Sequence, residues 1–326
     1  MLYALPAPLH GAIVSLFFVG NLLFWAVPVY VVIVFKLIPI RPLQGLCTDL
    51  LHWLCQRWQA GNTLFAETLN DTRWHLHQEV ALNQSQRYVV VSNHQTWNDI
   101  YVLMRVLGHQ VPFFKFFLKQ QLIWVPILGP VWWALDYPFM KRYSRAQIRE
   151  NPELAGKDLE TARASCAKYR RQPVTVLNFV EGTRFTPAKQ EAQSSPYTHL
   201  LRPKTGGLAL AVAALGDLTD KLIDVTIVYH GGAVGFWDFM CGRMREVSVE
   251  VRELPVPAGW RTGDYAGDRD FRAEAQSWMA RLWEDKDARI AWMLAHPGAT
   301  PPADCAGGDA PIREPATPAS PEAAAG

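Results

Sequence analysis

Residues 88–99 read YVVVSNHQTWND, a stretch in which an apolar run is followed directly by polar residues. Three valines, residues 89–91, form an apolar β-branched run typical of a buried strand. Polar residues end this run, and His94 is followed five positions later by Asp99. An imidazole is suited to proton transfer near neutral pH, and a carboxylate can fix its tautomer. The pair is therefore a candidate catalytic base with the group that orients it.

The spacing of this pair sets a condition on the local fold. Residues three or four apart are neighbours on a helix, whereas a separation of five places two side chains about 140° apart. His94 and Asp99 can meet only if the backbone near His94 is a turn and a helix begins after it. Without further motifs, a histidine near an aspartate is more often an ordinary polar pair than a catalytic one, so both interpretations stay open at this point.

The first 35 residues contain no Asp, Glu, Lys or Arg, and residues 11–35 form an almost unbroken apolar run. At 1.5 Å per residue this run makes a helix of roughly 37 Å, which is long enough to cross a bilayer. A signal peptide fits poorly, because no basic segment precedes the run and no small-residue cleavage site follows it. Asn21 and Pro28 could kink the helix, so a re-entrant or monotopic hairpin is the alternative to a spanning helix. Either arrangement predicts membrane attachment.

The distribution of charge along the chain limits the classes of partner that the protein can be expected to bind. Basic residues follow the apolar run and none precedes it, which places the bulk of the protein on the cytoplasmic side. The net charge of +2 points neither to nucleic acid nor to an acidic partner. Residues 101–171 carry a local surplus of +7, which suits an anionic lipid surface or a phosphorylated substrate. The five cysteines include no CxxC pair, which indicates a reducing compartment and no structural zinc site.

The sequence pattern divides the chain into three parts. Residues 1–70 are a membrane anchor that ends in an amphipathic helix. Residues 71–296 form the folded domain, with strands at 89–91, 174–180, 222–229 and 247–254 and helices at 97–107, 151–171, 206–215 and 268–294. This alternation predicts an α/β fold with a largely parallel or mixed central sheet flanked by helices. Residues 297–326 are rich in Pro and Ala, which predicts a disordered tail.

Aromatic residues are unusually dense between residues 111 and 144, where lysines and prolines interrupt them. Plain core packing explains most aromatic clusters. Paired tryptophans with interior lysines equally suit a surface at the membrane interface, where lysine stems reach toward the headgroups.

A second polar motif, Glu181-Gly182-Thr183-Arg184, directly follows the strand at 174–180. Because ligands in open α/β sheets bind beyond the carboxyl ends of the strands, the two motifs are expected to face one crevice. Gly182 permits close approach of a ligand to the backbone, and Arg184 offers a forked donor suited to phosphate. Taken alone, the tetrapeptide would more often be a tight turn with a surface ion pair.

Together the motifs resemble the signature of the glycerolipid acyltransferases, the lysophosphatidic acid acyltransferase family. NHxxxxD (Asn93, His94, Asp99) and EGTR (residues 181–184) occur in order, with PILG at 126–129 and FMKR at 139–142 between them. The runs FVEGTRFTPAKQ and HLLRPKTGG look most like the lysophospholipid acyltransferase branch that has enterobacterial inner-membrane members. Val180 stands where the family usually has Pro or Cys, which removes no chemistry. The likeness covers about residues 85–235.

The resemblance implies an enzyme that moves a fatty acyl group from a thioester to a free hydroxyl of a lysophospholipid. The simplest acceptor is 1-acyl-glycerol-3-phosphate, which would give phosphatidic acid. His94 would be the general base, Asp99 would orient it, and Asn93 would shape the turn. Glu181 would hold Arg184 or bind a glycerol hydroxyl. The residues expected to bind the acceptor are Glu181, Gly182, Thr183 and Arg184, with Lys141, Arg142 and Lys204 as further candidates for its phosphate.

No metal or cofactor is expected for this reaction, and the co-substrate would be acyl-CoA or acyl carrier protein. Lys204 could equally be a lone surface lysine, and His199 and His230 are interpreted as structural. The branch implies the bacterial inner membrane as the location. A catalytically silent lipid-phosphate-binding protein on the same scaffold and a lipid or thioester hydrolase are the alternatives. The headgroup, the chain length, the donor carrier and the oligomeric state are left open.

Overall fold

The structure is a computed structural model that describes residues 5–126, 128–141, 143, 145–154, 156–302 and 305. Its centre is a six-stranded sheet in the order β1-β8-β7-β2-β6-β3. These strands are β1 (Arg73–Gln78), β2 (Tyr88–Ser92), β3 (Phe114–Lys115), β6 (Thr175–Phe179), β7 (Lys221–Tyr229) and β8 (Glu246–Leu254). A separate small pair is formed by β4 (Leu118–Lys119) and β5 (Phe139–Met140).

The central sheet is mixed, with its parallel strands in the middle. β3, β6, β2 and β7 run parallel to one another, whereas β8 is antiparallel to β7 and carries β1 parallel to itself. The carboxyl ends of β2, β6 and β7 therefore lie at one edge, as expected for a ligand crevice. The predicted fold class, a largely parallel or mixed sheet flanked by helices, is confirmed.

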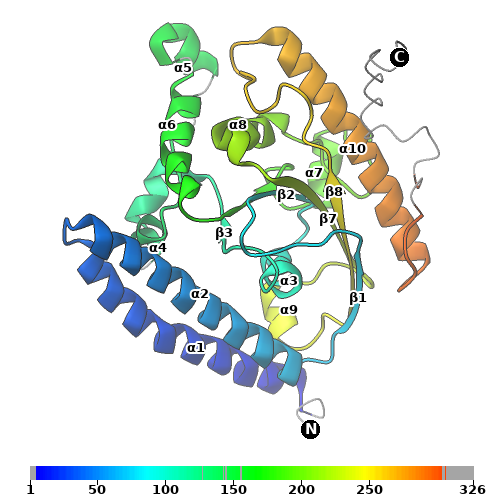
Figure 1. Cartoon of the computed structure of the whole chain (residues 1–326). Coiled ribbons are helices and arrows are strands. Elements are labelled where there is room, and N and C mark those ends of the chain that lie inside the picture. Colours follow the sequence, from blue (N-terminus) through cyan, green and yellow to red (C-terminus); the bar gives the residue numbers. More distant parts are fainter. Residues whose placement is uncertain are drawn as a thin grey trace, which may run out of the picture.

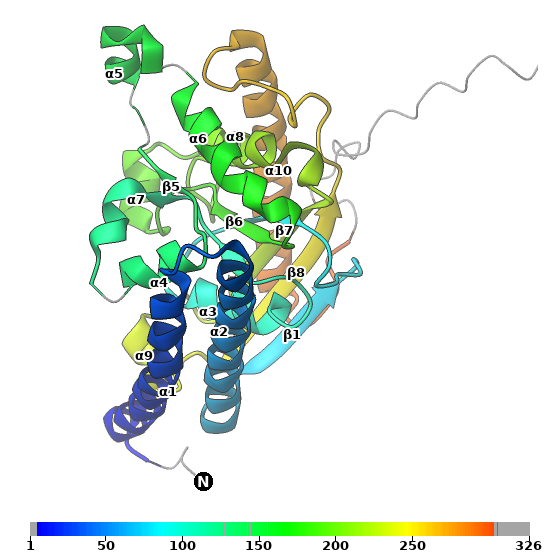
Figure 2. The ribbon, with the colours of Figure 1, turned by 60° about the vertical axis from the view of Figure 1, so that its left-hand side comes forward.

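Helices cover both faces of the sheet (Figure 1). The longer ones are α1 (Ala7–Lys36), α2 (Arg41–Leu69), α3 (Asn98–Leu107), α6 (Lys157–Cys166), α8 (Thr205–Leu215) and α10 (Arg269–Ala295). The shorter ones are α4 (Leu128–Ala134), α5 (Arg145–Glu150), α7 (Pro187–Ala192) and α9 (Phe236–Met240), with 3₁₀ segments at 120–124, 152–154, 167–170 and 216–218. In Figures 1 and 2, α1 and α2 lie side by side on one flank of the molecule, and α10 lies on another.

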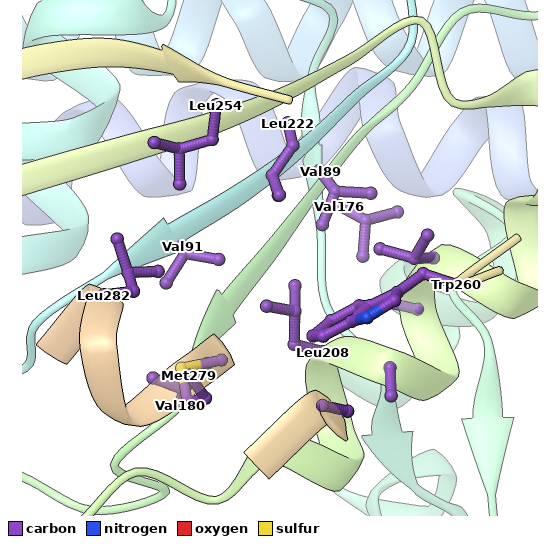
Figure 3. Packing of buried hydrophobic residues seen from close by; sticks show 14 of the residues in the cluster. Val89, Val91, Val176, Val180, Leu208, Leu222, Leu254, Trp260, Met279 and Leu282 are labelled. Carbon is purple, nitrogen blue, oxygen red and sulfur yellow. The ribbon is translucent and has the colours of Figure 1, made fainter. Parts of the chain in front are cut away.

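The three valines of β2 divide the core into two layers, because successive side chains of a strand point to opposite faces. Val89 and Val91 pack with residues of α8 and α10, among them Leu208, Met279 and Leu282, as Figure 3 shows. Val90 packs on the other face, with residues of α3. All three valines have no exposed surface, so β2 is a central, fully buried strand as its sequence predicts.

α1 is one continuous helix through Pro28, and α2 folds back along it. Among the described residues, α1 is the helix that is long and apolar enough to cross a membrane by length and composition, and most of it is exposed. Its two ends are nevertheless attached to the rest of the molecule. His10 Nε2 lies 2.8 Å from the carbonyl of Leu69, and the buried Lys36 ammonium donates to Ala134 O at 2.5 Å and to Asp136 at 3.0 Å.

Several elements differ from the sequence-based expectation. The predicted helix at 151–171 is a shorter helix, α6, between two 3₁₀ segments. β1 was not expected, because its sequence RWHLHQ is polar and half exposed, as suits an edge strand. In the aromatic segment at 111–144, Phe114 is buried in the core while Trp124 is 84% exposed, so core packing accounts for only part of the segment and its role at a membrane stays a prediction. Most of the tail predicted at 297–326 lies outside the described residues.

Candidate active site

The two sequence motifs meet at the carboxyl edge of the sheet. β2 and β6 are adjacent and parallel, with Ser92 opposite Phe179, so His94 and the turn at 181–184 leave the sheet side by side. The two loops are also hydrogen-bonded to each other, because Phe185 N–H donates to the carbonyl of His94 at 2.7 Å. The two motifs therefore lie together at the predicted crevice, although Glu181 follows Asp99 by 82 positions in the sequence.

His94 and Asp99 form a hydrogen-bonded pair. His94 Nδ1 lies 2.7 Å from Asp99 Oδ2, and the same oxygen accepts the N–H groups of Gln95 at 2.6 Å and Thr96 at 3.0 Å. α3 begins only at Asn98, so residues 93–97 are the turn that a spacing of five requires. Since an ionised carboxylate only accepts, Nδ1 carries the proton in the neutral ring and Nε2 is left as the basic nitrogen.

Neighbouring strands fix the position of the histidine loop. Asn93 is buried, and its side chain pairs with both the N–H and the carbonyl of Ile227 on β7, each at 2.9 Å. The ring of His94 stacks on Phe179 at the end of β6, with centroids 4.0 Å apart and planes 15° apart. This loop is thus held from both sides by the strands that flank β2.

Glu181 does not take the place expected for it. Its side chain is fully buried, and its two oxygens accept the N–H of His94 at 2.7 Å and the N–H of Leu201 at 2.9 Å. Burial, which outweighs these hydrogen bonds, raises the pKa of the carboxyl to about 7. Among the described residues no ion pair joins Glu181 to Arg184, and Glu181 is not among the residues that line the cavity. The expected contact with Arg184 is therefore wrong, because the carboxylate is occupied by the backbone.

A cavity of about 690 Å³ opens beside His94. Part of its wall is polar and cationic, with Gly182, Thr183, Arg184 and Lys204. Another part of its wall is apolar and includes Phe116, Phe117, Met140 and Leu210. A ligand in this cavity would meet a basic nitrogen, positive charge and hydrocarbon surface at once.

The cationic wall has a defined local structure. Gly182 has φ of +69°, and a Cβ there would lie 3.0 Å from Lys204 Nζ, so glycine allows this turn to approach the lysine. The Arg184 guanidinium lies over the ring of Trp97 at 4.8 Å. Lys189, which the sequence did not single out, donates to Thr183 Oγ1 at 2.8 Å and to the carbonyl of Arg184 at 3.0 Å.

One predicted phosphate ligand, Lys141, is not brought to this wall. Lys141 is exposed with its ammonium 5.9 Å from the ring of Tyr143, and it does not line the cavity. Arg142 lies outside the described residues. Within those residues no three His, Cys, Asp or Glu side chains are grouped to hold a metal ion.

A second, apolar cavity of about 430 Å³ lies on the other side of Trp97, among α1, α2, α3 and α9. Its lining includes Phe18, Trp58, Tyr101, Met104 and Phe236. Trp97 belongs to the walls of both cavities and is 58% exposed. The two cavities therefore offer two separate spaces for hydrocarbon that share Trp97, and His94 lines the first of them.

A base–carboxylate pair beside fixed cations, at the carboxyl edge of an α/β sheet, is an arrangement suited to an enzyme that moves protons on an anionic substrate. Residues 73–230 match the family model described as Acyltransferase. Both motifs and every strand from β1 to β7 lie within the matched range.

Curated relatives agree with this family. The chain is 26% identical over 183 residues to human 1-acyl-sn-glycerol-3-phosphate acyltransferase delta and 27% identical over 183 residues to the mouse gamma form. The alignments cover 53% of this chain and 44% of each relative, so the chain spans less than half the length of those relatives. The crystal structure of the 1-acyl-sn-glycerophosphate acyltransferase PlsC from Thermotoga maritima matches 87% of this chain and 99% of its own, with 16% identity and a TM-score of 0.49.

Proposed function

We propose that the protein transfers a fatty acyl group from an acyl thioester to the free hydroxyl of a lysophospholipid, with 1-acyl-glycerol-3-phosphate as the acceptor and phosphatidic acid as the product. The observation that carries the proposal is the placement of the His94–Asp99 pair at a cavity with one cationic and one apolar wall. The relatives named above act on the same acceptor by their names, and the family match covers the whole pair of motifs.

The acceptor would bind with its phosphate against Arg184 and Lys204 and the backbone of Gly182. This orientation brings the free hydroxyl toward Nε2 of His94. Nε2 removes the hydroxyl proton while the oxygen attacks the thioester carbonyl, and Asp99 stabilises the imidazolium that forms. Collapse of the tetrahedral intermediate breaks the carbon–sulfur bond, the imidazolium returns the proton to the thiolate, and a new ester remains. No covalent enzyme intermediate, metal or cofactor is needed for these steps.

Both substrates carry hydrocarbon, and the apolar wall and the second cavity would accept their chains. The donor would be acyl-CoA or acyl carrier protein. Access from a membrane is consistent with the exposed apolar residues of α1 and with exposed Trp124, Trp133, Phe236 and Trp237. The basic residues that follow α1 support a site on the cytoplasmic face, and the branch resemblance supports a location at the bacterial inner membrane.

The test is acyl transfer by purified, detergent-solubilised protein with lysophosphatidic acid and labelled oleoyl-CoA. His94→Ala should lower product formation by at least roughly a hundredfold, the usual contribution of a general base. His109→Ala, which changes an exposed histidine just after α3, is the matched control and should leave the rate unchanged.

Phosphatidic acid made at the parent rate by His94→Ala would contradict the assignment of the base. Free fatty acid released without an acceptor would indicate a hydrolase. If the parent makes no product with oleoyl-CoA, with acyl carrier protein or with other lysophospholipids, the binding-only alternative takes the place of this proposal.

A further inference from the structure

Tyr229 lies at the end of β7, next to the histidine loop. β7 continues four residues beyond Val225, which pairs with the last residue of β2, so its end runs alongside residues 93–96. The side chain of Tyr229 is 3% exposed, and its hydroxyl donates to Asp99 Oδ1 at 2.7 Å. No motif in the sequence marks this tyrosine, which is 130 positions from Asp99.

The two oxygens of Asp99 are held differently. Oδ2 receives His94 Nδ1 and two backbone N–H groups, whereas Oδ1 has Tyr229 as its one hydrogen-bond donor among the described residues. Burial and the neighbouring Asp99 charge raise the pKa of Tyr229 well above its ordinary value of 10. The hydroxyl therefore stays protonated and remains a donor over the whole range in which an imidazole titrates.

We propose that Tyr229 is a positioning residue that sets the basicity and orientation of His94 through its hydrogen bond to Oδ1 of Asp99. This inference rests on the proposed function. A donor on Oδ1 takes up part of the carboxylate charge, which weakens the attraction of Asp99 for the imidazolium. It also prevents the carboxylate from rotating away from Nδ1. Without the hydroxyl, His94 should hold its proton up to a higher pH and be available as a base at fewer pH values.

Other charged groups near the pair come from every neighbouring element. Glu181 at the end of β6 accepts the His94 N–H, and Lys286 of α10 exerts a charge effect on Glu181. His199, from the loop before α8, lines with Tyr229 a cavity of about 220 Å³. His230, the residue that follows β7, lies 2.7 Å from Ser248 Oγ through its Nε2, and Arg184 lies over Trp97. None of these groups is altered by replacing Tyr229 with phenylalanine, so a difference between the two proteins reports on the hydroxyl.

The decisive variant is Tyr229→Phe, which removes one oxygen and keeps the ring. Tyr88→Phe is the matched control, because Tyr88 is equally buried, bonds Asn83 and Gln86 through its hydroxyl, and lies at the opposite end of β2. The measurements are kcat and KM for acyl transfer between pH 5 and 9, with thermal unfolding of each protein. A second variant carries 3-fluorotyrosine at position 229, which is a stronger hydrogen-bond donor.

Tyr229→Phe should move the acidic limb of the kcat/KM profile upward by roughly one pH unit, with a roughly tenfold lower kcat on that limb and KM values unchanged. The fluorinated variant should move the limb downward. Tyr88→Phe should leave the limb in place. An unchanged limb in Tyr229→Phe, or a loss that follows only the unfolding temperature, overturns the inference. An inactive parent would overturn the proposed function instead, and the imidazole chemical shift of His94, followed against pH by NMR, would still show whether the hydroxyl matters.

Discussion

At the scale of single residues, the candidate base is placed mainly by backbone groups. Ile227 offers its N–H and carbonyl to Asn93, and the N–H groups of His94 and Leu201 converge on Glu181. A side chain whose hydrogen-bond partners are all backbone groups tolerates substitution poorly. If the substitution changes a donor or an acceptor, the backbone partner cannot adopt another rotamer to compensate. Glu181 is the clearest case.

Replacement of Glu181 by Gln tests that role. A carboxamide can accept one of the two N–H groups but turns an NH₂ toward the other, so the free energy of unfolding should fall by about 1–3 kcal/mol. kcat should fall because the His94 backbone loses its anchor, while KM for lysophosphatidic acid should stay constant. Urea unfolding and steady-state kinetics measure these effects, with Glu191→Gln on the exposed surface of α7 as the control. A raised KM with unchanged stability would restore the substrate-binding role expected from the sequence.

Lys115 of β3 is a second informative residue. It is 1% exposed, its ammonium has no hydrogen-bond partner among the described residues, and it lies 4.4 Å from the ring of Tyr169. Burial is the main cause that lowers its pKa to about 7, from an ordinary 10.5. Between these two pH values the unfolded chain binds the proton and the folded one does not, so this lysine makes stability rise with pH.

We therefore expect Lys115→Met to stabilise the protein, on the order of 3 kcal/mol at pH 7 and below. The gain should shrink as the pH rises toward 10.5, where the lysine is neutral in both states. Lys119→Met, four residues away and exposed, should change little. Denaturant unfolding at several pH values gives the comparison. A variant less stable than the parent at pH 7 would mean that the buried ammonium makes a favourable contact.

At the scale of elements, the hairpin of α1 and α2 bears on the membrane arrangement that the sequence left open. Lys36 attaches one end of α1 to the folded domain at Ala134. At the other end His10 is bonded to Leu69, the last residue of α2, and Gly11 lies against Cys241 of the folded domain, so the helix is held near both ends. α2 lies against it and carries Arg41, Asp49, Arg57 and Glu67. A helix that crossed the bilayer with these contacts intact would draw those charges into hydrocarbon, which is costly. We expect α1 to lie in the plane of one leaflet.

Cysteine labelling tests this arrangement. Pro6→Cys and Ile40→Cys lie at the two ends of α1, and Cys305→Ser removes the one native cysteine that is not buried. A membrane-impermeant maleimide should label both positions to the same extent in inside-out vesicles and neither in right-side-out vesicles. Labelling in detergent provides the reference for full access. Labelling of the two ends from opposite faces would show that α1 spans the bilayer.

The elements that the sequence predicted are those whose own residues form an apolar pattern that indicates burial. β2, β6, β7 and α10 bury mainly apolar residues, although α10 also buries Lys286 and β7 buries Asp224, and each element lies within a residue or two of its expected range. β1 is a polar edge strand that depends on β8 for its form, and β3, β4 and β5 are two-residue pairings. Such elements exist because of their neighbours, so no local pattern can predict them.

At the scale of the whole molecule, the site also contains residues of two kinds: those that a local sequence motif reveals, and those that only the folded arrangement brings to the site. His94, Asp99 and Arg184 could be singled out because the motifs are contiguous in sequence. Tyr229 and the backbone of Leu201 reach the site only through the order of the strands and the path of the loop before α8. Sheet order is a long-range property, and one sequence does not reveal which strand will lie beside which.

Figure 2 shows α1, α2 and α9 on one flank of the molecule and α10 on another, and the two flanks differ in their side chains. The flank made by α1, α2 and α9 exposes apolar residues, whereas α10 is tied to the sheet by a buried ionic network. In that network Lys286 binds Asp224 at 2.6 Å, and Arg252 joins Asp224 to Asp285 at 2.8 and 2.7 Å. Such a network tolerates little change in the register of α10, which keeps the end of β7 beside the histidine loop.

The attachment of α1 at distant points also constrains the order of events during synthesis. Gly11 lies against Cys241. Since synthesis adds roughly 5–20 residues per second, Cys241 leaves the ribosome roughly ten seconds or more after Gly11. During that interval the apolar helix has only α2, lipid or a chaperone to cover it. We therefore expect the hairpin to bind the bilayer before the domain has folded. The nascent chain would then complete its sheet, which needs Ile227 and Tyr229, on a segment that is already anchored.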